Sequence, residues 1–286
     1  MMKQMVRTKS LLLACSMAAL LAAGCSQTEK ADPAPAAATP APSITASAPA
    51  AVSPQIEEIK KKGKLVIATG DYYPFEYLDP DTKKLVGYDI DLGQKIADKI
   101  GVPVEWKEMQ FTALIPSVQN GQADMAIAAM YITDERKQAV DMSDSYLGTG
   151  MSLVKLSGDS SVNSINDLDG KTVGVKAGAT SEKAANDLVA KGTKLKVVSY
   201  KDTTDYLLDL QLGRVDVAFN DYVNQMGYNK QHREAKLEIV GDPFIEADLG
   251  LAVKKGNAGL LQLANDVIKE LQANGQAQEL YDKWLK

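Results

Sequence analysis

Cysteine and histidine are scarce in this chain, which has only Cys15, Cys25 and His232 among its 286 residues. Both cysteines stand near the N-terminus, so the rest of the chain has no thiol for a disulfide, a zinc site or nucleophilic catalysis. A Ser-His-Asp triad would have to use His232. A basic excess is also missing, because 32 Lys and Arg stand against 37 Asp and Glu. The inventory predicts no metal site, no cofactor and no nucleic-acid partner.

Residues 1–24 have the pattern of a secretory signal peptide, with basic residues followed by an apolar run that ends in small residues. The run is shorter than the ~20 apolar residues of a typical membrane span. Small residues directly before Cys25 resemble a bacterial lipobox, in which the chain is cut ahead of the cysteine and that cysteine receives a lipid. Ala22 stands where lipoboxes usually have Leu, so an ordinary secreted protein remains the alternative.

Residues 25–56 would then be the lipidated cysteine and a tether, because six prolines stand in a background of Ala, Ser and Thr. Such a segment lacks the large apolar side chains that offset the entropy of ordering. We predict an extended tether. A domain spaced in this way from a lipid anchor works just outside a membrane, either in a periplasm or on the outer face of the cytoplasmic membrane.

From residue 57 onward, patterns typical of strands alternate with patterns typical of helices. This order indicates βαβ units with parallel strands, an α/β fold. Asp89 or Asp91 is expected to cap the first helix of this region, and Gly101 to end it. The patterns predict strands over 65–68, 104–106 and 123–130, and helices over 89–100 and 112–119.

Two short motifs occur twice. Gly-Gln-Ala-Asp-Met-Ala at 121–126 resembles Gly-Arg-Val-Asp-Val-Ala at 213–218, and Gly-Lys-Leu-Val at 63–66 resembles Gly-Lys-Thr-Val at 170–173. Each half of the chain would therefore have its own strand-helix-strand core, and we infer two α/β lobes.

The segment Gly-Tyr-Asp-Ile-Asp-Leu at 87–92 resembles the signature of family 3 extracellular solute-binding proteins, the polar amino-acid receptors of ABC importers. Residues 71–76 resemble the first ligand loop of that family, 128–136 its carboxylate-binding segment and 167–171 the entry to its second lobe. From about residue 59 to the end the similarity is nearly continuous.

The resemblance implies the two-lobed periplasmic-binding-protein fold, or flytrap, in which the chain crosses twice between lobes. It places residues 57–147 and 247–286 in lobe one and residues 148–246 in lobe two. The final helices would thus pack back on the first lobe.

A free amino acid presents a carboxylate and an ammonium, and a receptor must replace the water around both. By the resemblance, Arg136 binds the carboxylate, which a planar guanidinium can grip with two prongs. Asp221, just past a buried strand, binds the ammonium. Composition alone would favour a solvated helix arginine and leaves a turn or helix-cap aspartate equally open.

The rest of the expected pocket follows from the resemblance by position. The rings of Tyr72 and Phe111 would sandwich the ligand side chain, and backbone groups of Ala129 and Tyr131 would contact the carboxylate and ammonium. Gly178 and Thr180, at the start of a helix, would donate to the ligand from lobe two, and Lys176 and Asn220 would face its side chain. Tyr131 departs from the many relatives that have Ser or Thr at this position.

The resemblance implies a monomeric receptor that delivers a free L-amino acid to the permease and ATPase subunits of an ABC importer. Lys176 disfavours a cationic ligand, which favours glutamine or a similar polar amino acid. Receptors for arginine, lysine and ornithine often carry aspartate where this chain has Thr69. Asp71 and Glu76 keep such a cationic ligand as an alternative.

An enzyme is the competing class, because cyclohexadienyl dehydratases share this fold. Glu76 would be the candidate general acid. His232 lies in a charged stretch typical of solvated surface. We expect no enzyme activity, and a ligand-sensing domain of a receptor is a third interpretation.

Overall fold

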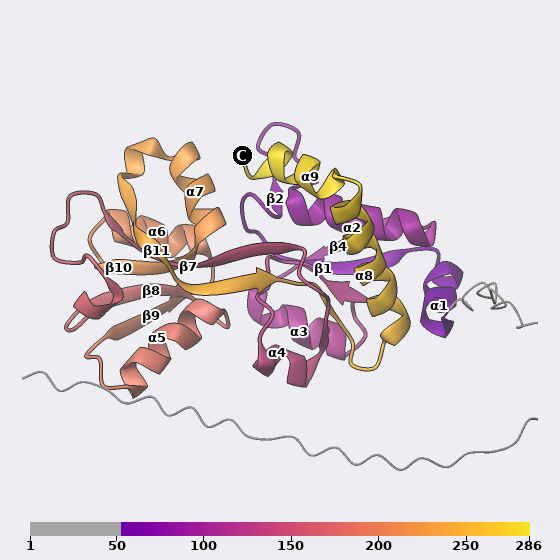
Figure 1. Ribbon diagram of the computed structural model, residues 1–286, viewed down its shortest axis with the longest axis horizontal. Helices are drawn as coiled ribbons and strands as arrows, with labels where there is room; N and C mark the ends of the chain where they lie inside the picture. The colour runs from indigo at the N-terminus through magenta and orange to yellow at the C-terminus, as the bar shows by residue number, and fades with distance from the viewer. Residues whose placement is uncertain (1–52) are drawn as a thin grey trace, which may run out of the picture. The chain divides into compact units, whose positions relative to one another are not determined.

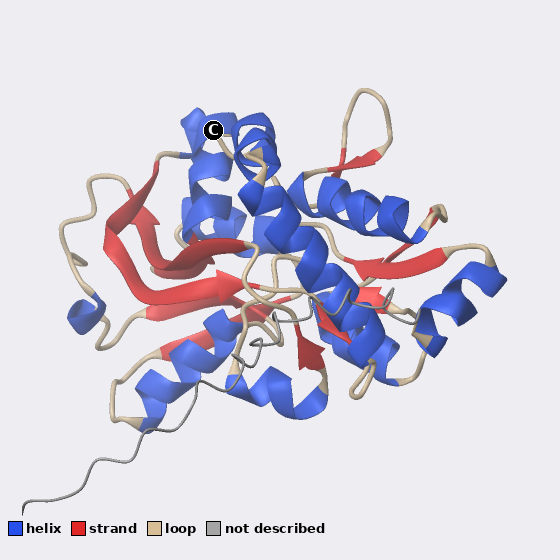
Figure 2. Ribbon diagram, turned by 45° about the vertical axis from the view of Figure 1, so that its right-hand side comes forward, coloured by secondary structure: helices blue, strands red, loops and turns tan. Residues whose placement is uncertain are grey.

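The computed structural model describes residues 53–286, so the predictions for residues 1–24 and for Cys25 lie outside the described residues, as does most of the tether. Two five-stranded sheets dominate the described part, and a two-stranded ribbon is added to them. Each sheet has helices on both of its faces (Figures 1 and 2). We call the sheet that contains β1, with its helices, the first lobe, and the sheet that contains β10, with its helices, the second lobe.

The first lobe is a mixed sheet whose interior includes a strand from the C-terminal part of the chain. β1 pairs in parallel with both β4 and β5, and β12 pairs antiparallel with β5 and β6. The sheet order is β4 (Val104–Glu108), β1 (Leu65–Thr69), β5 (Met125–Ala126), β12 (Ala252–Val253) and β6 (Asp141–Met142).

β1 is buried on both faces, as its continuous apolar run predicts. Leu65 and Ile67 belong to one core cluster, and Val66 and Ala68 belong to another on the opposite face. α3 contacts the sheet on the second of these faces, while α2 packs against α8 and α9. The helices and ribbon strands of this lobe are α1 (Pro54–Lys62), α2 (Tyr88–Ile100), α3 (Phe111–Gln119), α4 (Asp134–Ala139), α8 (Ala258–Ala273), α9 (Gln276–Trp284), β2 (Tyr77–Leu78) and β3 (Leu85–Val86).

α2 confirms the predicted helix, and Gly101 ends it in the left-handed conformation as expected. The predicted cap is wrong, because the N-cap residue is Gly87, with φ of 139°. A side chain at Gly87 would meet the carbonyl of Phe75 at 2.1 Å, so only glycine fits. The carboxylate of Asp89 instead accepts a bond from the backbone N–H of Ala129, 40 residues further along the chain.

The predicted strand over 123–130 is shorter in the structure, where β5 holds only Met125 and Ala126. Ile127 still donates its N–H to the carbonyl of Ala68. Ala129 then adopts φ of +44°, which turns the chain out of the sheet. The apolar run predicted burial correctly, but the turn it contains has no glycine or proline to reveal it.

The second lobe is also a mixed sheet, and its two longest strands, β7 and β11, pair antiparallel from Leu147↔Leu249 to Leu156↔Leu237. Their paired ends at Leu147 and Leu249 lead into the first lobe, so these strands are the two crossovers. The sheet order is β11 (Leu237–Leu249), β7 (Leu147–Leu156), β10 (Val217–Asp221), β8 (Thr172–Lys176) and β9 (Lys196–Tyr200). Its helical segments are η1 (Ile165–Asp167), α5 (Thr180–Ala190), α6 (Thr203–Gln211), α7 (Tyr222–Gln231) and η2 (Arg233–Ala235).

The sequence repeat has the same structural role in both lobes. In the first lobe, Asp124 accepts a hydrogen bond from the N–H of Val66 at 2.8 Å. In the second, Asp216 accepts one from the N–H of Thr172 at 2.6 Å. Each aspartate thus ties the start of one strand to the start of its parallel neighbour, which supports the inference of two related lobes.

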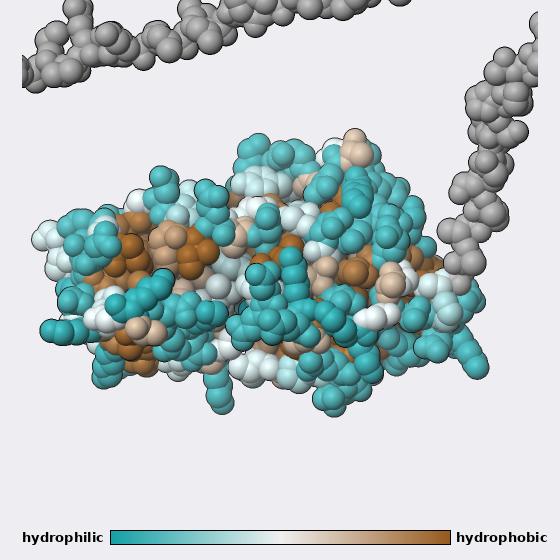
Figure 3. All heavy atoms as spheres, turned by 60° about the horizontal axis from the view of Figure 1, so that its bottom comes forward, coloured by the Kyte–Doolittle hydropathy of each residue, from teal (hydrophilic) through white to brown (hydrophobic). Residues whose placement is uncertain are grey.

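No helix within residues 53–286 has the length and apolar character of a membrane span. On the face drawn in Figure 3, hydrophilic side chains surround smaller hydrophobic areas. Large apolar side chains that are exposed include Leu208, Leu212 and Met226.

Candidate functional site: a charged cavity between the lobes

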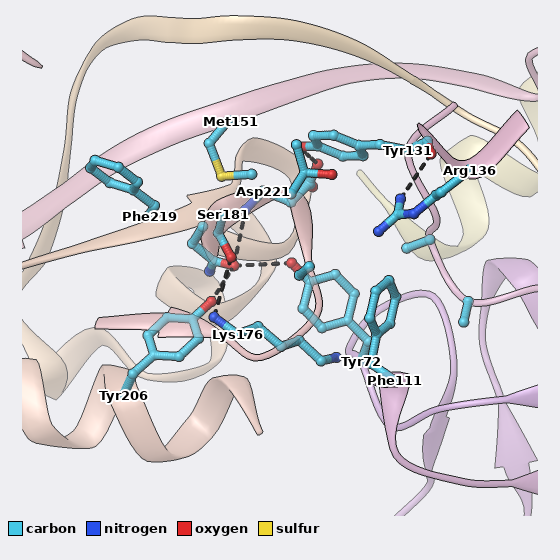
Figure 4. A pocket seen from close by; sticks show the side chains of 15 residues that line it. Tyr72, Phe111, Tyr131, Arg136, Met151, Lys176, Ser181, Tyr206, Phe219 and Asp221 are labelled. Carbon is cyan, nitrogen blue, oxygen red and sulfur yellow. Dashed lines mark hydrogen bonds between the residues drawn. The ribbon is translucent and has the colours of Figure 1, made fainter. Parts of the chain in front are cut away.

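A cavity lies between the two lobes, where three strands end. Tyr72 follows β1, Lys176 ends β8 and Asp221 ends β10. Ligands of open α/β sheets bind at the carboxyl ends of strands, so the topology alone favours this place. Figure 4 shows side chains of both lobes pointing into the same space. The lining residues are Tyr72, Phe111, Ala128, Ala129, Tyr131, Arg136, Met151, Lys176, Ala179, Thr180, Ser181, Tyr206, Phe219, Asn220 and Asp221.

Arg136 is a buried guanidinium on the first lobe, only 8% exposed. It stands in the first turn of α4, where Thr133 caps the helix by accepting a bond from its N–H. Nη1 donates to the carbonyl of Tyr131 at 2.8 Å (Figure 4). No carboxylate within residues 53–286 makes an ion pair with Arg136. Burial lowers the pKa of this guanidinium to about 10, so its charge is costly here unless an anion joins it.

Asp221 is the buried acid that faces the cavity from the second lobe, and it is 5% exposed. It caps α7, because its Oδ1 accepts the N–H of Asn224 at 3.0 Å. Its Oδ2 accepts from the hydroxyls of Tyr131 and Thr149, at 2.7 and 2.8 Å. Burial raises the pKa of Asp221, while these donors favour its charged form. The aspartate is therefore both a helix cap and part of the cavity wall.

Lys176 brings a second cation to the cavity from the second lobe. Its ammonium lies 4.5 Å from the ring centroid of Tyr72 and 5.1 Å from that of Phe111, both on the first lobe. The residue is 8% exposed, and no acceptor within the described residues bonds to its Nζ. Burial lowers its pKa, opposed by the charges of nearby acids that include Glu76 and Asp71. Two aromatic rings of the first lobe therefore lie against a positive charge to which no anion within residues 53–286 is hydrogen-bonded.

Asn220 lines the cavity, but protein groups already use its amide. Oδ1 accepts from the hydroxyls of Tyr72 and Tyr206, at 3.0 and 2.8 Å. Nδ2 donates to the side chains of Asn224 and Gln225. Asn220 therefore holds the wall of the cavity together, and few of its polar positions face inward.

Gly178 is the one predicted site residue that does not line this cavity. Its N–H donates to Glu182 Oε2 at 2.8 Å, inside its own lobe. A side chain here would meet Thr112 of the first lobe at 2.8 Å, so glycine allows the lobes to approach closely. Gly178 lies instead in a neighbouring groove, which shares Arg136 and Thr180 with the cavity.

Two buried carboxyls lie behind the cavity wall. Asp89 is fully buried, and its Oδ2 accepts bonds from the N–H of Ala129 and the hydroxyl of Tyr146. Burial raises the pKa of Asp89 to about 7. Burial, together with the charge of neighbouring Asp89, raises the pKa of Glu76, 1% exposed, well above its usual range. The bond from its N–H to Asp89 holds Ala129 in its strained conformation at the cavity.

Sequence reasoning missed several apolar and hydroxyl residues of the cavity. Met151 and Phe219 belong to strands β7 and β10, and Tyr206 belongs to α6. Ser181, in the first turn of α5, accepts the N–H of Lys176 at 3.2 Å. Their sequence pattern is that of ordinary buried positions, so only the packing of the lobes distinguishes them. No group of three or more His, Cys, Asp or Glu side chains in residues 53–286 is arranged to hold a metal ion.

Two α/β lobes are joined by two crossover strands and enclose a cavity in which Arg136 and Lys176 have no ion-paired acid within residues 53–286, and this arrangement defines a two-lobed solute-binding protein. Residues 65–286 match the model of the bacterial extracellular solute-binding proteins, family 3. The chain belongs to this family.

Relatives with different ligand names match about four fifths of this chain. The L-cystine-binding protein TcyJ of Escherichia coli (strain K12) is 31% identical over 231 residues, 80% of this chain and 85% of that protein. The ABC transporter glutamine-binding protein GlnH of Bacillus subtilis (strain 168) is 31% identical over 234 residues, 80% of this chain and 83% of that protein. The solved structure of an ancestral arginine-binding protein bound to arginine is 40% identical, with a TM-score of 0.74, and covers 78% of this chain and 99% of its own.

Proposed function

We propose that this protein is the extracytoplasmic receptor of an ABC importer and binds one free L-amino acid between its lobes. The observation that carries the proposal is that the guanidinium of Arg136 is buried and forms no ion pair with a carboxylate within residues 53–286. A ligand carboxylate would supply the missing anion through two parallel bonds. Asp221, across the same cavity, would receive the ammonium.

The two rings of the first lobe support the same mode of binding. Tyr72 and Phe111 both line the cavity, and both rings lie close to the Lys176 ammonium. A ligand side chain between them would bury apolar surface on both faces while its end met Lys176. The backbone of Ala129 and Tyr131, and Thr180 at the start of α5, would complete the contacts to the carboxylate and ammonium.

A polar neutral ligand, above all glutamine, agrees best with the charges of the cavity. Lys176 would repel a guanidinium or ammonium at the end of the ligand side chain. Thr69 is fully buried, and its hydroxyl donates to the carbonyl of Ile127, so it offers no charge to a cationic ligand. Asp71 beside Lys176 is the feature that favours the cationic alternative, an arginine, lysine or ornithine receptor.

The contacts of Glu76 argue against the enzyme alternative. Its carboxyl is buried beside Asp89 and does not line the cavity, so it is badly placed to protonate a ligand there. His232 is exposed and lies 3.3 Å from Glu234 on the surface. Binding without chemistry is therefore the function that we propose.

Binding would close the lobes about the crossovers near Leu147 and Leu249. We assign residues 57–147 and 247–286 to one moving body and residues 148–246 to the other. The ligand shifts the equilibrium by the contacts it gains in the closed form, and the permease and ATPase subunits then receive the closed, loaded receptor. The receptor would act as a monomer.

Anchoring is a separate part of the proposal. After removal of residues 1–24, a lipid on Cys25 would hold the receptor at the cell membrane, with the tether as a spacer. Labelling cells with a radioactive fatty acid tests this. The wild type should take up label and Cys25→Ser should not, and equal labelling of both would refute it.

A thermal-shift screen of the standard amino acids, ornithine and cystine on the purified protein tests the function. A ligand at a hundred times its dissociation constant should stabilise the folded state by about 2.7 kcal/mol. Glutamine should give the largest shift. A screen without any shift, repeated by calorimetry, would contradict the proposal, and a shift with arginine alone would select the cationic alternative.

A further inference from the structure

Tyr131 of the first lobe bonds directly to the acid of the second lobe. Its hydroxyl donates to Asp221 Oδ2 at 2.7 Å, and both residues are nine-tenths or more buried. The backbone of Tyr131 belongs to the first lobe, because it lies between β5 and α4, and Ile127, four residues earlier, donates its N–H to the carbonyl of Ala68 in β1. Asp221 lies at the end of β10 in the second lobe. This bond therefore spans the cleft.

Thr149 gives the same acid an equivalent bond from within the second lobe. Its hydroxyl donates to Asp221 Oδ2 at 2.8 Å, and β7, which holds it, is hydrogen-bonded to β10. A carboxylate has about four acceptor positions. Tyr131, Thr149 and the N–H of Asn224 use three of them. Both hydroxyls use Oδ2, and the helix cap uses Oδ1.

We propose that the Tyr131 hydroxyl is a cross-lobe latch: it fixes the carboxylate of Asp221 toward the cavity and stabilises the closed arrangement of the lobes even when no ligand is bound. The latch builds on the function proposed above, since it acts on the acid assigned to the ammonium. Tyr131 is thus a positioning residue, and its ring takes the place of the small hydroxyl side chain that the family resemblance leads one to expect.

Other contacts between the lobes also join protein groups. Tyr72 donates to Asn220 Oδ1 at 3.0 Å, and Asn224 donates to the carbonyl of Tyr73. Each of these joins a residue of the first lobe to one of the second. The Tyr131 bond differs from them because its acceptor is a buried carboxylate, and hydrogen bonds to charged groups are the strong ones. Removing it should therefore shift the lobes more than removing either neutral bond.

The test compares Tyr131→Phe with Thr149→Val, since each removes one hydroxyl from the same oxygen. Small-angle X-ray scattering on purified, ligand-free protein measures closure, and calorimetry with L-glutamine, L-arginine and L-cystine measures binding. Tyr131→Phe should increase the radius of gyration, and Thr149→Val should leave it unchanged. Both should weaken binding of the preferred amino acid by roughly tenfold or more. Asp221→Ala, which removes the acceptor, should expand the ligand-free protein as Tyr131→Phe does.

An unchanged radius of gyration in Tyr131→Phe, or an equal expansion in Thr149→Val, would overturn the latch. Circular dichroism would first confirm that each variant is folded, and Asp221→Ala provides the second variant if Tyr131→Phe is not. If the wild type binds none of the three amino acids, the proposed function is in doubt. The scattering comparison would still test the latch in that case, so a failure of the latch can be distinguished from a failure of the proposed function.

Discussion

Replacing Arg136 by Met should greatly weaken amino-acid binding without weakening the fold. The side chain is 8% exposed and has no acidic partner in residues 53–286. Burial lowers its pKa to about 10, and at 1.36 kcal/mol per pKa unit the charged form costs on the order of 3 kcal/mol in the folded protein. Methionine fills similar space without that cost. The free energy of unfolding of the ligand-free variant should therefore stay constant or rise by up to about 3 kcal/mol.

The loss of binding should be larger than any gain in stability. A bidentate carboxylate makes two charge-assisted bonds to the guanidinium, each worth about 1.5–3 kcal/mol. Losing both weakens binding by about 3 kcal/mol or more, which is at least a hundredfold in Kd. Titration calorimetry with the amino acid selected by the screen measures the affinity, and urea denaturation measures the stability.

Arg214 is the matched control. Its side chain is 65% exposed, and it bonds to Asp209 at 2.9 Å on the surface of the second lobe. Arg214→Met should leave the affinity unchanged and alter stability by no more than about 1 kcal/mol. Binding of Arg136→Met within threefold of the wild type would refute the assignment. A loss of stability above about 2 kcal/mol would show that Arg136 instead supports the fold.

Three further perturbations test other parts of the account. Lys176→Met should raise the affinity for arginine roughly tenfold relative to glutamine, because it removes a like charge from the cavity; an unchanged ratio in competition calorimetry would place Lys176 away from the ligand. Burial raises the pKa of Asp89 to about 7, so its contribution to stability is complete below pH ~4 and is lost as the pH rises toward 7. Asp89 stays buried in Glu76→Gln, but the amide is a donor that favours the charged carboxylate, so the variant should lose less stability than the wild type between pH 5 and 7.5 in urea denaturation; equal losses in variant and wild type would argue against contact between the two side chains. Leu260→Ala should cost about 2–5 kcal/mol of stability, since Leu260 is fully buried in α8; a cost below 1 kcal/mol would contradict the docking of that helix on the first lobe.

The sequence predicted the regular elements well where local pattern and burial agree. The predicted bounds of α2 and β1 agree with the observed bounds to within one residue at each end. The predicted strand over 123–130 is longer than the observed β5, because the apolar residues of this segment are buried for two different reasons. Met125 and Ala126 lie in the sheet, whereas Ala129 is buried in a turn at the cavity. Hydrophobicity reports burial and does not distinguish these conformations.

The residues of the candidate site could likewise be predicted from the sequence, whereas the hydrogen bonds among them could not. The resemblance selected residues that the structure gathers around one cavity, including Arg136 and Asp221. It did not reveal that the amide of Asn220 is occupied by other side chains or that Tyr131 reaches across the cleft. Such bonds join residues up to 148 positions apart, and their geometry depends on how two independently formed sheets meet. No local pattern carries that information.

The place of β12 in the first sheet sets the order in which the two sheets can be completed when the chain emerges with its N-terminus first. The second lobe draws all its strands from 147–249, an unbroken stretch, so it can complete its sheet as soon as that stretch is available. The first lobe must keep a gap between β5 and β6 until Ala252 and Val253 arrive, followed by the two C-terminal helices that cover it. A chain that emerges with its N-terminus first can therefore complete the second lobe before the first, and a chain that ends before residue 252 would leave β5 and β6 without the strand that joins them.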